Sequence, residues 1–244
     1  MKKVFFILMG FVMFFNTKSE AFKADVFKTK SGKDIKITFI KHGSLMIDYD
    51  GKIIQIDPVS DYADYKKFSK FSKADFIFIT HEHSDHFDKK AIKDCRKDNT
   101  QIILNPSAKN MLDEGKEIKN GDKIVLYNGF EVEAVPAYNT TTGRTKFHPK
   151  GRDNGYIFTF DGFRIYVAGD TENIPEMKNF TNIDVAFLPV NQPYTMTVEQ
   201  AVDAILMLRS PIFYPYHYSS TNVDKIVELL KNEKSIDVRI RSMQ

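Results

Sequence analysis

Cysteine is almost missing from this sequence, since Cys95 is the only one in 244 residues. No intramolecular disulfide can form, and a structural zinc site built from several thiolates is excluded. No histidine stands near Cys95 in the sequence, so we interpret it as a packing residue of a helix rather than a catalytic nucleophile. The G-x-S-x-G motif of serine hydrolases is absent as well. An activity that needs an activated serine or cysteine is therefore not favoured.

Long linkers and a strong charge of one sign are also missing. No stretch rich in glycine, proline or serine is long enough to separate two domains, so we expect one domain from Phe22 to Gln244. The formal net charge is +3, and residues 1–21 carry +2 of it. A chain so close to neutral gives no general reason to expect nucleic acid as a partner. Hydrophobic residues make up 42% of the chain, which argues against disorder.

The apolar run VFFILMGFVMFF, residues 4–15, is too short for a transmembrane helix, which needs about 20 apolar residues. It follows the basic start MKK and precedes small residues at Ser19 and Ala21, as in a secretory signal peptide. We predict that residues 1–21 are a signal peptide cleaved after Ala21. The mature chain would then be exported, periplasmic or secreted, without a transmembrane span. An uncleaved N-terminal anchor is the alternative.

Two hairpins of matching form indicate two similar halves. SLMIDYDGKIIQIDP and GYIFTFDGFRIYVAGD each place an Asp-Gly turn between two alternating runs, and a carboxylate, Asp57 or Asp170, ends each segment's second run. Strand and helix patterns alternate after each hairpin. This order predicts an α/β sandwich with two central sheets and helices in the outer layers. The predicted helices are residues 84–95, 107–114, 173–180, 197–209 and 222–232, and the last predicted strand is 237–242.

The most informative run is FIFITHEHSDHFD, in which His81, His83, Asp85 and His86 follow a buried strand pattern. Alternate side chains of extended backbone point to one side, so His81 and His83 can reach one metal ion. Asp85 and His86, in the turn that follows, can face a second ion. Three imidazoles and a carboxylate suit zinc, which favours nitrogen ligands and accepts carboxylate oxygen. The alternative is a polar loop that caps the next helix through Ser84 or Asp85.

The run THEHSDHFD resembles the H-x-H-x-D-H signature of the metallo-β-lactamase superfamily, whose fold is an αββα four-layer sandwich of two similar halves. ITFIKHGSLMIDYDGKIIQIDPV is similar to the opening hairpin of that superfamily, and VAGDT and PYHY to its later ligand segments. VPAYN, FHPKG, YVAGDT and LPV followed by TMT resemble the branch that contains L-ascorbate-6-phosphate lactonase. The resemblance implies two zinc ions, with Mn²⁺ or another divalent ion as an alternative. The implied ligands are His81, His83 and His148 for the first ion, Asp85, His86 and His217 for the second, and Asp170 bridging both.

Three of these implied ligands have alternatives. In several superfamily members the third histidine follows a strand directly, and Asn139 stands at that place here, whereas His148 lies in the next loop. His148 could therefore be a surface histidine. Asp170 could instead be a turn residue or a helix cap, and His217 a core histidine.

Other residues are candidates for supporting roles. Asp57 could accept the outer N–H of a ligand imidazole, or it could form a strand-end turn with Pro58. His42 is the second candidate for orienting the ligands. The candidates for substrate contact are Asn191, Tyr194 and Arg144.

These residues predict a metal-dependent hydrolase. Zinc lowers the pKa of bound water to about 7, so a hydroxide shared by two zinc ions would attack an ester, a lactone or a phosphodiester. Asp85 or Asp170 would orient it and move its proton. We expect a small-molecule or lipid-like substrate. The alternatives are RNA processing or β-lactam hydrolysis within the same superfamily, and a non-catalytic exported zinc-binding protein.

Overall fold

The computed structural model describes residues 22–67 and 73–243. The predicted signal peptide, residues 1–21, lies outside the described residues. Within the ranges that are described, no helix is long and apolar enough to cross a membrane.

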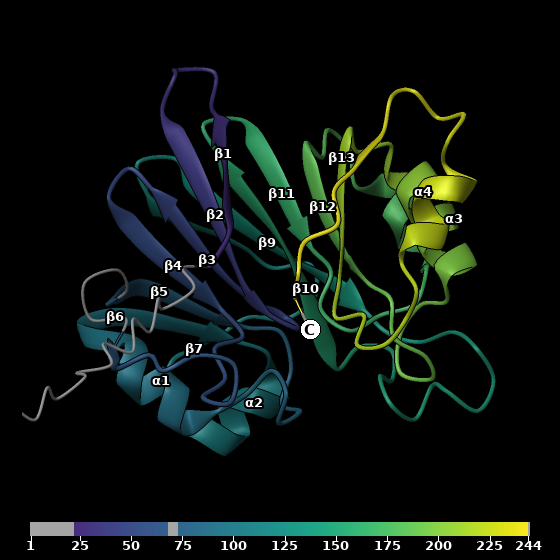
Figure 1. The fold of residues 1–244 in the computed structure, drawn as a ribbon. Coiled ribbons are helices and arrows are strands. Elements are labelled where there is room, and N and C mark those ends of the chain that lie inside the picture. Colours follow the sequence, from purple (N-terminus) through teal and green to yellow (C-terminus); the bar gives the residue numbers. More distant parts are fainter. Residues whose placement is uncertain (1–21, 68–72, 244) are drawn as a thin grey trace, which may run out of the picture.

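Two seven-stranded sheets face each other at the centre of the described part of the chain (Figure 1). The first contains, in spatial order, β1 (Ala24–Lys28), β2 (Asp34–Lys41), β3 (Ser44–Tyr49), β4 (Lys52–Ile56), β5 (Ala74–Ile79), β6 (Arg96–Leu104) and β7 (Lys116–Glu117). The second contains β8 (Lys123–Tyr127), β9 (Phe130–Ala137), β10 (Asp153–Phe160), β11 (Phe163–Val167), β12 (Val185–Pro189), β13 (Ile212–Tyr216) and β14 (Asp237–Val238). In each sheet the first three pairings are antiparallel and the last three are parallel. This common plan confirms the prediction of two similar halves.

Helices form the two outer layers of the sandwich. Figure 1 shows α1 (Lys89–Cys95) and α2 (Pro106–Leu112) beside the first sheet, and α3 (Val198–Leu208) and α4 (Asp224–Leu229) beside the second. Cys95 is buried in α1, within the apolar cluster that joins this helix to the first sheet. The predicted αββα sandwich is therefore confirmed. The surroundings of Cys95 agree with its interpretation as a packing residue.

Several predicted elements are shorter than the sequence pattern suggested. The helix predicted at 84–95 begins only at Lys89, because the Asp88 carboxylate accepts the N–H groups of Lys90 and Ala91 and caps the helix there. Residues 173–180 form a short 3₁₀ helix, Pro175–Asn179, that lacks a side-chain cap. The last strand is limited to Asp237–Val238.

The inner faces of the two sheets are joined by aromatic side chains. Phe78 of β5 meets Phe158 of β10 at a centroid distance of 5.0 Å, and Tyr49 of β3 meets Phe160 at 4.8 Å. These side chains are buried, and burying each stabilises the fold by about 1.5–3 kcal/mol. The packing fixes the position of one sheet relative to the other, and thus of the loops at their edges.

The two hairpin turns have the geometry that the Asp-Gly pairs predict. The φ angles are 53° and 73° at Asp50 and Gly51, and 49° and 78° at Asp161 and Gly162. Positive φ at both central positions is required by type I′ turns, which match the twist of the flanking strands. The turns set the register of β3 with β4 and of β10 with β11, so the strand ends that follow occupy equivalent places in the two halves.

Candidate metal centre

Loops from both sheets meet at one edge of the sandwich. His81 follows β5 of the first sheet, and His217 follows β13 of the second. Asp170 lies just beyond β11. Because parallel neighbouring strands end at the same edge of a sheet, their following loops gather there. Among the described residues, two groups of side chains at this edge could each hold a metal ion, and a third group, His81, His86 and Asp170, overlaps both.

The first group consists of His81, His83 and His148, whose ligand atoms lie within 4.8 Å of one another. The ring centroids are 4.7 Å apart for His81 and His83, 5.0 Å for His81 and His148, and 4.9 Å for His83 and His148. The side-chain amide of Asn139 instead donates to the backbone oxygen of Tyr194 at 2.7 Å. The structure thus brings His148, and not Asn139, to the other two histidines.

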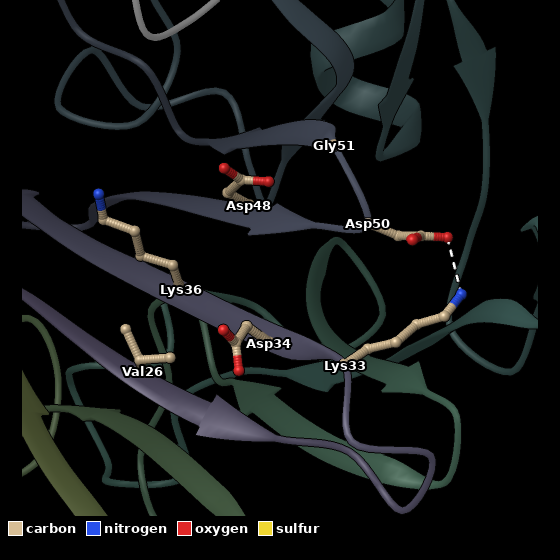
Figure 2. A pocket seen from close by; sticks show the side chains of 7 residues that line it. All are labelled: Val26, Lys33, Asp34, Lys36, Asp48, Asp50 and Gly51. Carbon is tan, nitrogen blue, oxygen red and sulfur yellow. Dashed lines mark hydrogen bonds and ion pairs between the residues drawn. The ribbon is translucent and has the colours of Figure 1, made fainter.

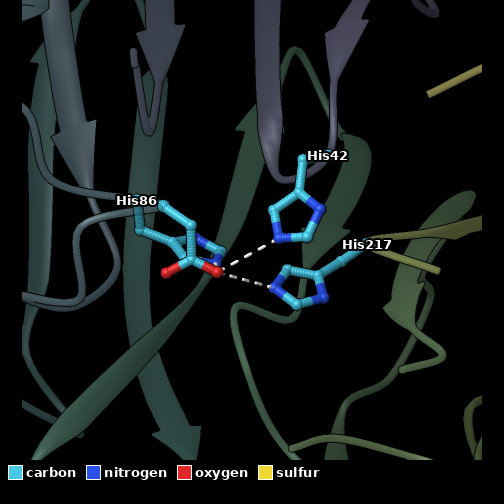
Figure 3. Close-up of side chains that lie close together, drawn as sticks. His42, His86 and His217 are labelled. Carbon is cyan, nitrogen blue, oxygen red and sulfur yellow. Dashed lines mark hydrogen bonds and ion pairs between the residues drawn. The ribbon is translucent and has the colours of Figure 1, made fainter. Parts of the chain in front are cut away.

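The second group consists of Asp85, His86, His217 and His42. Oδ2 of Asp85 lies 3.1 Å from Nε2 of His42 and 3.4 Å from Nε2 of His217. Figure 3 shows the three imidazoles of this group gathered around one carboxylate. The rings of His42 and His217 are only 3.6 Å apart between centroids. His42, expected to orient ligands, therefore also presents a nitrogen to this group.

Asp170 lies between the two groups. Its Oδ2 is 3.4 Å from Nε2 of His148 and 3.2 Å from Nε2 of His217, while its Oδ1 is 3.3 Å from Nε2 of His86. His81 completes the surroundings, with its Nε2 at 3.9 Å from Oδ2. The two oxygens thus face imidazoles of both groups, which is the position that a bridging carboxylate needs.

Asp57 orients two of the imidazoles, His86 directly and His81 through Thr80. Its Oδ2 lies 2.8 Å from Nδ1 of His86 and accepts the hydroxyl proton of Thr80 at 2.7 Å. The Thr80 oxygen is in turn 3.0 Å from Nδ1 of His81. A carboxylate accepts these bonds, so Nδ1–H of His86 donates to Asp57 and Nδ1–H of His81 donates to Thr80. Both histidines are left with an Nε2 lone pair directed at the metal centre.

Asp153 supports His148 in the same way, and the sequence analysis missed it. Its Oδ2 lies 2.9 Å from Nδ1 of His148, while Arg152 donates to its Oδ1 from Nε at 2.7 Å. Asp153 is fully buried at the start of β10. A carboxylate shortly after a loop histidine was the available signal, but sequence does not show that the two side chains point toward each other.

Several polar atoms of the cluster are buried without a hydrogen bond to any described residue. They are Nε2 of His81, His86 and His217, Nδ1 of His217, and Oδ1 of Asp170. Leaving such atoms unpaired costs about 1–3 kcal/mol each. A cation bound among the three Nε2 atoms and the carboxylate would satisfy all of them except Nδ1 of His217, so the residues present fit a metal ion.

Burial and opposite charge act against each other in this cluster. Burial and the nearby His86 lower the pKa of His81 well below its ordinary value. Burial also opposes a charge on His217, but Asp170 outweighs it and raises the pKa of His217 to about 9. Burial would raise the pKa of Asp170, yet His217 and His86 hold it well below its ordinary value. Buried groups with such opposed shifts are typical of functional sites.

Close packing around the cluster depends on Gly43. A β-carbon at this position would lie 2.6 Å from Cε1 of His86, a contact that real side chains do not make. The adjacent His42 and the distant His217 both adopt positive φ, 56° and 48°, and the backbone N–H of His217 donates to the oxygen of His42 at 3.2 Å. Such backbone conformations in residues other than glycine are costly and cluster at functional sites.

A pocket of about 320 Å³ opens over the cluster. Five cluster residues form part of its lining, and the remaining lining residues are Ser84, Phe147, Asn191 and Tyr194. Asn191 and Tyr194, two of the three candidates for substrate contact, therefore line this pocket. Arg144 is not among the lining residues, and its guanidinium lies 3.7 Å from the Glu172 carboxylate.

A hollow of about 440 Å³ lies on the outer face of β1–β3 (Figure 2). Its lining includes Val26, Lys36 and Asp48, whose neighbours along each strand point into the core. Lys33 at its rim is paired with Asp50 at 2.8 Å. The hollow contains none of the described histidines, so the metal centre remains the candidate functional site.

Comparisons with known proteins identify the family to which the chain belongs. A family model described as a beta-lactamase superfamily domain matches residues 36–217. A UPF0173 metal-dependent hydrolase from Geobacillus sp. is 31% identical over 212 residues, covering 76% of this chain and 86% of the relative. The crystal structure of a proposed metal-dependent hydrolase from Parabacteroides distasonis has a TM-score of 0.89 at 58% identity, covering 92% of this chain and all of that one. Igni18, a metallo hydrolase from Ignicoccus hospitalis, has a TM-score of 0.72 at 25% identity, covering 86% and 95%.

The chain belongs to the metallo-β-lactamase superfamily, with the fold and the histidine–carboxylate cluster described above. Its relatives identify it more particularly as a metal-dependent hydrolase of the kind represented by the UPF0173 proteins. The likeness to the L-ascorbate-6-phosphate lactonase branch stays a prediction.

Proposed function

We propose that the protein is a zinc-dependent hydrolase that binds two ions. His81, His83 and His148 would hold one, Asp85, His86 and His217 the other, and Asp170 would contact both. The observation that carries the proposal is the place of Asp170, within 3.2–3.4 Å of Nε2 atoms from both groups. When bound, the ions would ionise a water molecule near neutral pH and polarise the electrophilic oxygen of an ester, lactone or phosphodiester.

The two carboxylates of the cluster have different surroundings and suit different tasks. Asp170 is buried among imidazoles, which fits a role in fixing the positions of the reacting groups. The side chain of Asp85 is 39% exposed and lines the pocket. Its Oδ2 faces Nε2 of His42 and Nε2 of His217, where the second ion would be held, so its Oδ1 is the atom that we assign to accept a proton from the attacking water and return it to the leaving group.

Metal removal tests this proposal most directly. Protein stripped with a strong chelator should lose hydrolysis of a panel of 4-nitrophenyl esters and phosphodiesters, and regain it when zinc is added back. Addition of Mn²⁺ to a parallel sample would show whether another divalent ion also restores hydrolysis. Metal analysis should find close to two zinc ions in the wild type and fewer in His83→Ala. Bound zinc with no turnover across the panel would favour a non-catalytic zinc-binding protein, and the absence of any bound divalent ion would overturn the proposal.

The basic and apolar N-terminal segment supports a further proposal, that the protein is exported and acts on a small-molecule or lipid-like substrate outside the cytoplasm. Expression of the full chain followed by cell fractionation and N-terminal sequencing tests the export. We expect a soluble exported form that begins at Phe22. A membrane-bound form with an intact N-terminus would support the uncleaved anchor instead.

A further inference from the structure

The pocket over the metal centre has an aromatic wall. The rings of Phe147 and Tyr194 meet edge to face, with centroids 5.0 Å apart and an interplanar angle of 72°. Phe147 belongs to the loop after β9 and Tyr194 to the loop after β12. Both rings line the pocket, and neither residue is fully buried. Apolar surface is therefore available to a group that enters beside the metal centre.

Asn139 ties these two loops together. Its side-chain amide donates to the backbone oxygens of Tyr194 and Arg144, at 2.7 and 3.3 Å, and its backbone N–H donates to the oxygen of His148 at 2.8 Å. The aromatic wall and a histidine of the metal centre are thus fixed by the same residue. The wall has a defined position relative to the place where the substrate would react.

Three of the four lysine and arginine side chains in the loop after β9 are already paired with carboxylates. The pairs are Arg144 with Glu172, Lys150 with Glu176, and Arg152 with Asp153, at nitrogen–oxygen distances of 3.7, 2.9 and 2.7 Å. Lys146 is exposed, with its ammonium nitrogen 5.2 Å from the centroid of Phe147. Among the residues that the structure describes, the pocket lining includes no lysine or arginine.

This lining disfavours an anionic substrate. A phosphodiester carries its negative charge on two oxygens, and beyond the metal centre the lining offers such an oxygen only the neutral side chains of Ser84, Asn191, Phe147 and Tyr194. Removing charge from water without a partner is costly, and the face of an aromatic ring is itself electron-rich. An uncharged carboxylic ester has a single carbonyl oxygen for the metal centre and an apolar chain for the wall.

We propose that the substrate is an uncharged carboxylic ester or lactone whose acyl chain or ring packs against Phe147 and Tyr194. This inference rests on the proposed hydrolase function and narrows its substrate class. Water adds to the carbonyl carbon, the bond from that carbon to the alkoxy oxygen breaks, and the proton taken by Asp85 passes to the leaving alcohol. The products are an alcohol and a carboxylic acid, which releases its remaining proton to solvent to become a carboxylate, so no further reactant is needed.

A chain-length series tests the apolar wall in the zinc-loaded protein. The substrates are 4-nitrophenyl esters from acetate to hexanoate, which share one leaving group. We expect kcat/KM to rise by roughly two- to fourfold per added methylene, the range expected for burying a methylene in an apolar site. Phe147→Ala and Tyr194→Ala should flatten the series, whereas Lys146→Ala, a change in the same loop, should keep its slope. A flat series in the wild type would overturn the inference.

A matched pair of substrates tests the preference for a neutral group. 4-Nitrophenyl hexanoate and the 4-nitrophenyl monoester of adipic acid differ by a terminal methyl against a carboxylate. We expect the hexanoate to have a kcat/KM at least about tenfold higher, since the carboxylate would face the aromatic wall. Equal or better turnover of the adipate ester would overturn the inference. Turnover of the adipate ester that is lost in Lys146→Ala would also overturn it, because Lys146 would then bind the carboxylate.

A third substrate separates this inference from the proposed function. Ethyl 4-nitrophenyl phosphate is an anionic diester with the same leaving group. Turnover of this diester without turnover of any ester would overturn the substrate class and leave the metal-dependent hydrolase in place. No turnover of any of these substrates by zinc-loaded protein would overturn both. Melting temperature and zinc content of each variant identify those that fail to fold or to load.

Discussion

The two halves of the sandwich have the same strand plan but supply the metal centre in different ways. The first half contributes His81, His83, Asp85 and His86 from one loop after β5, and His42 from the turn between β2 and β3. The second half contributes its side chains singly, from the loops after β9, β11 and β13. The first set depends on the local geometry of a short segment, while the second depends on the register of several strands. Two halves with the same strand order can therefore contribute different numbers of side chains per loop to one site.

The largest effect should follow from removing the carboxylate that joins the two groups. Asp170→Ala should lower kcat/KM by roughly 10³-fold or more, as removal of a central catalytic group does, and should lower the affinity for both zinc ions. Steady-state kinetics and metal analysis measure the two effects. Asp203→Ala removes an exposed carboxylate from α3 and is the matched control. If Asp170→Ala retained both ions, the bridging carboxylate would not be needed to hold them.

The same contrast explains what the sequence could predict. The H-x-H-x-D-H run and the Asp-Gly hairpins are local patterns, so the first-half ligands and the two-halved sandwich followed from spacing and from resemblance. Asp170 and His217 needed the resemblance, because nothing local distinguishes a strand-end ligand from a turn or core residue. The sequence did not decide whether His148 or Asn139 joins His81 and His83, because the answer depends on the packing of the loop after β9. Asp153 was missed, since its bond to His148 depends on how β10 begins.

The carboxylates that accept hydrogen bonds from the imidazoles allow the two halves to be compared through side chains with the same task. Asp57 supports His86 in the first half, and Asp153 supports His148 in the second. Asp57→Asn and Asp153→Asn should each weaken zinc binding by about 10- to 100-fold, the usual cost of losing such a partner. Competition with a chromogenic chelator measures the affinities, with Asp48→Asn on the outer face of β3 as the control. An effect in only one variant would show that zinc binding depends on the supporting carboxylate in one half of the molecule and not in the other.

Close packing of the β2–β3 loop against the first-half cluster can be tested without metal. Gly43→Ala places a methyl group against the His86 ring, and overpacking of this kind costs about 1–3 kcal/mol. Urea unfolding of metal-free protein measures the loss. If the contact with His86 is the cause, the same substitution should cost far less in a His86→Ala background. An equal loss in both backgrounds would locate the cost elsewhere in the loop.

The smallest expected effect concerns a contact between the halves outside the metal centre. Asp25 of β1 accepts hydrogen bonds from Tyr214 of β13 and from Nη2 of Arg241, the latter at 2.6 Å. Burial would raise the pKa of Asp25, but Tyr214 and Arg241 outweigh it and hold the pKa below its ordinary value of 3.8. A carboxyl group with a lowered folded-state pKa stabilises the fold above its ordinary pKa, and the contribution disappears as the pH falls through the folded-state value.

Asp25→Asn should therefore lower the free energy of unfolding by roughly 1–2 kcal/mol at neutral pH, as expected for hydrogen bonds to a partly exposed charged group. The difference from wild type should shrink as the pH falls below 3.8 and the wild-type carboxyl group also becomes protonated. Urea unfolding at several pH values measures this, and Asp34→Asn, on an exposed pair with Lys28, should change little at any pH. A difference that stayed constant with pH would mean that the two halves are held here by shape rather than by charge.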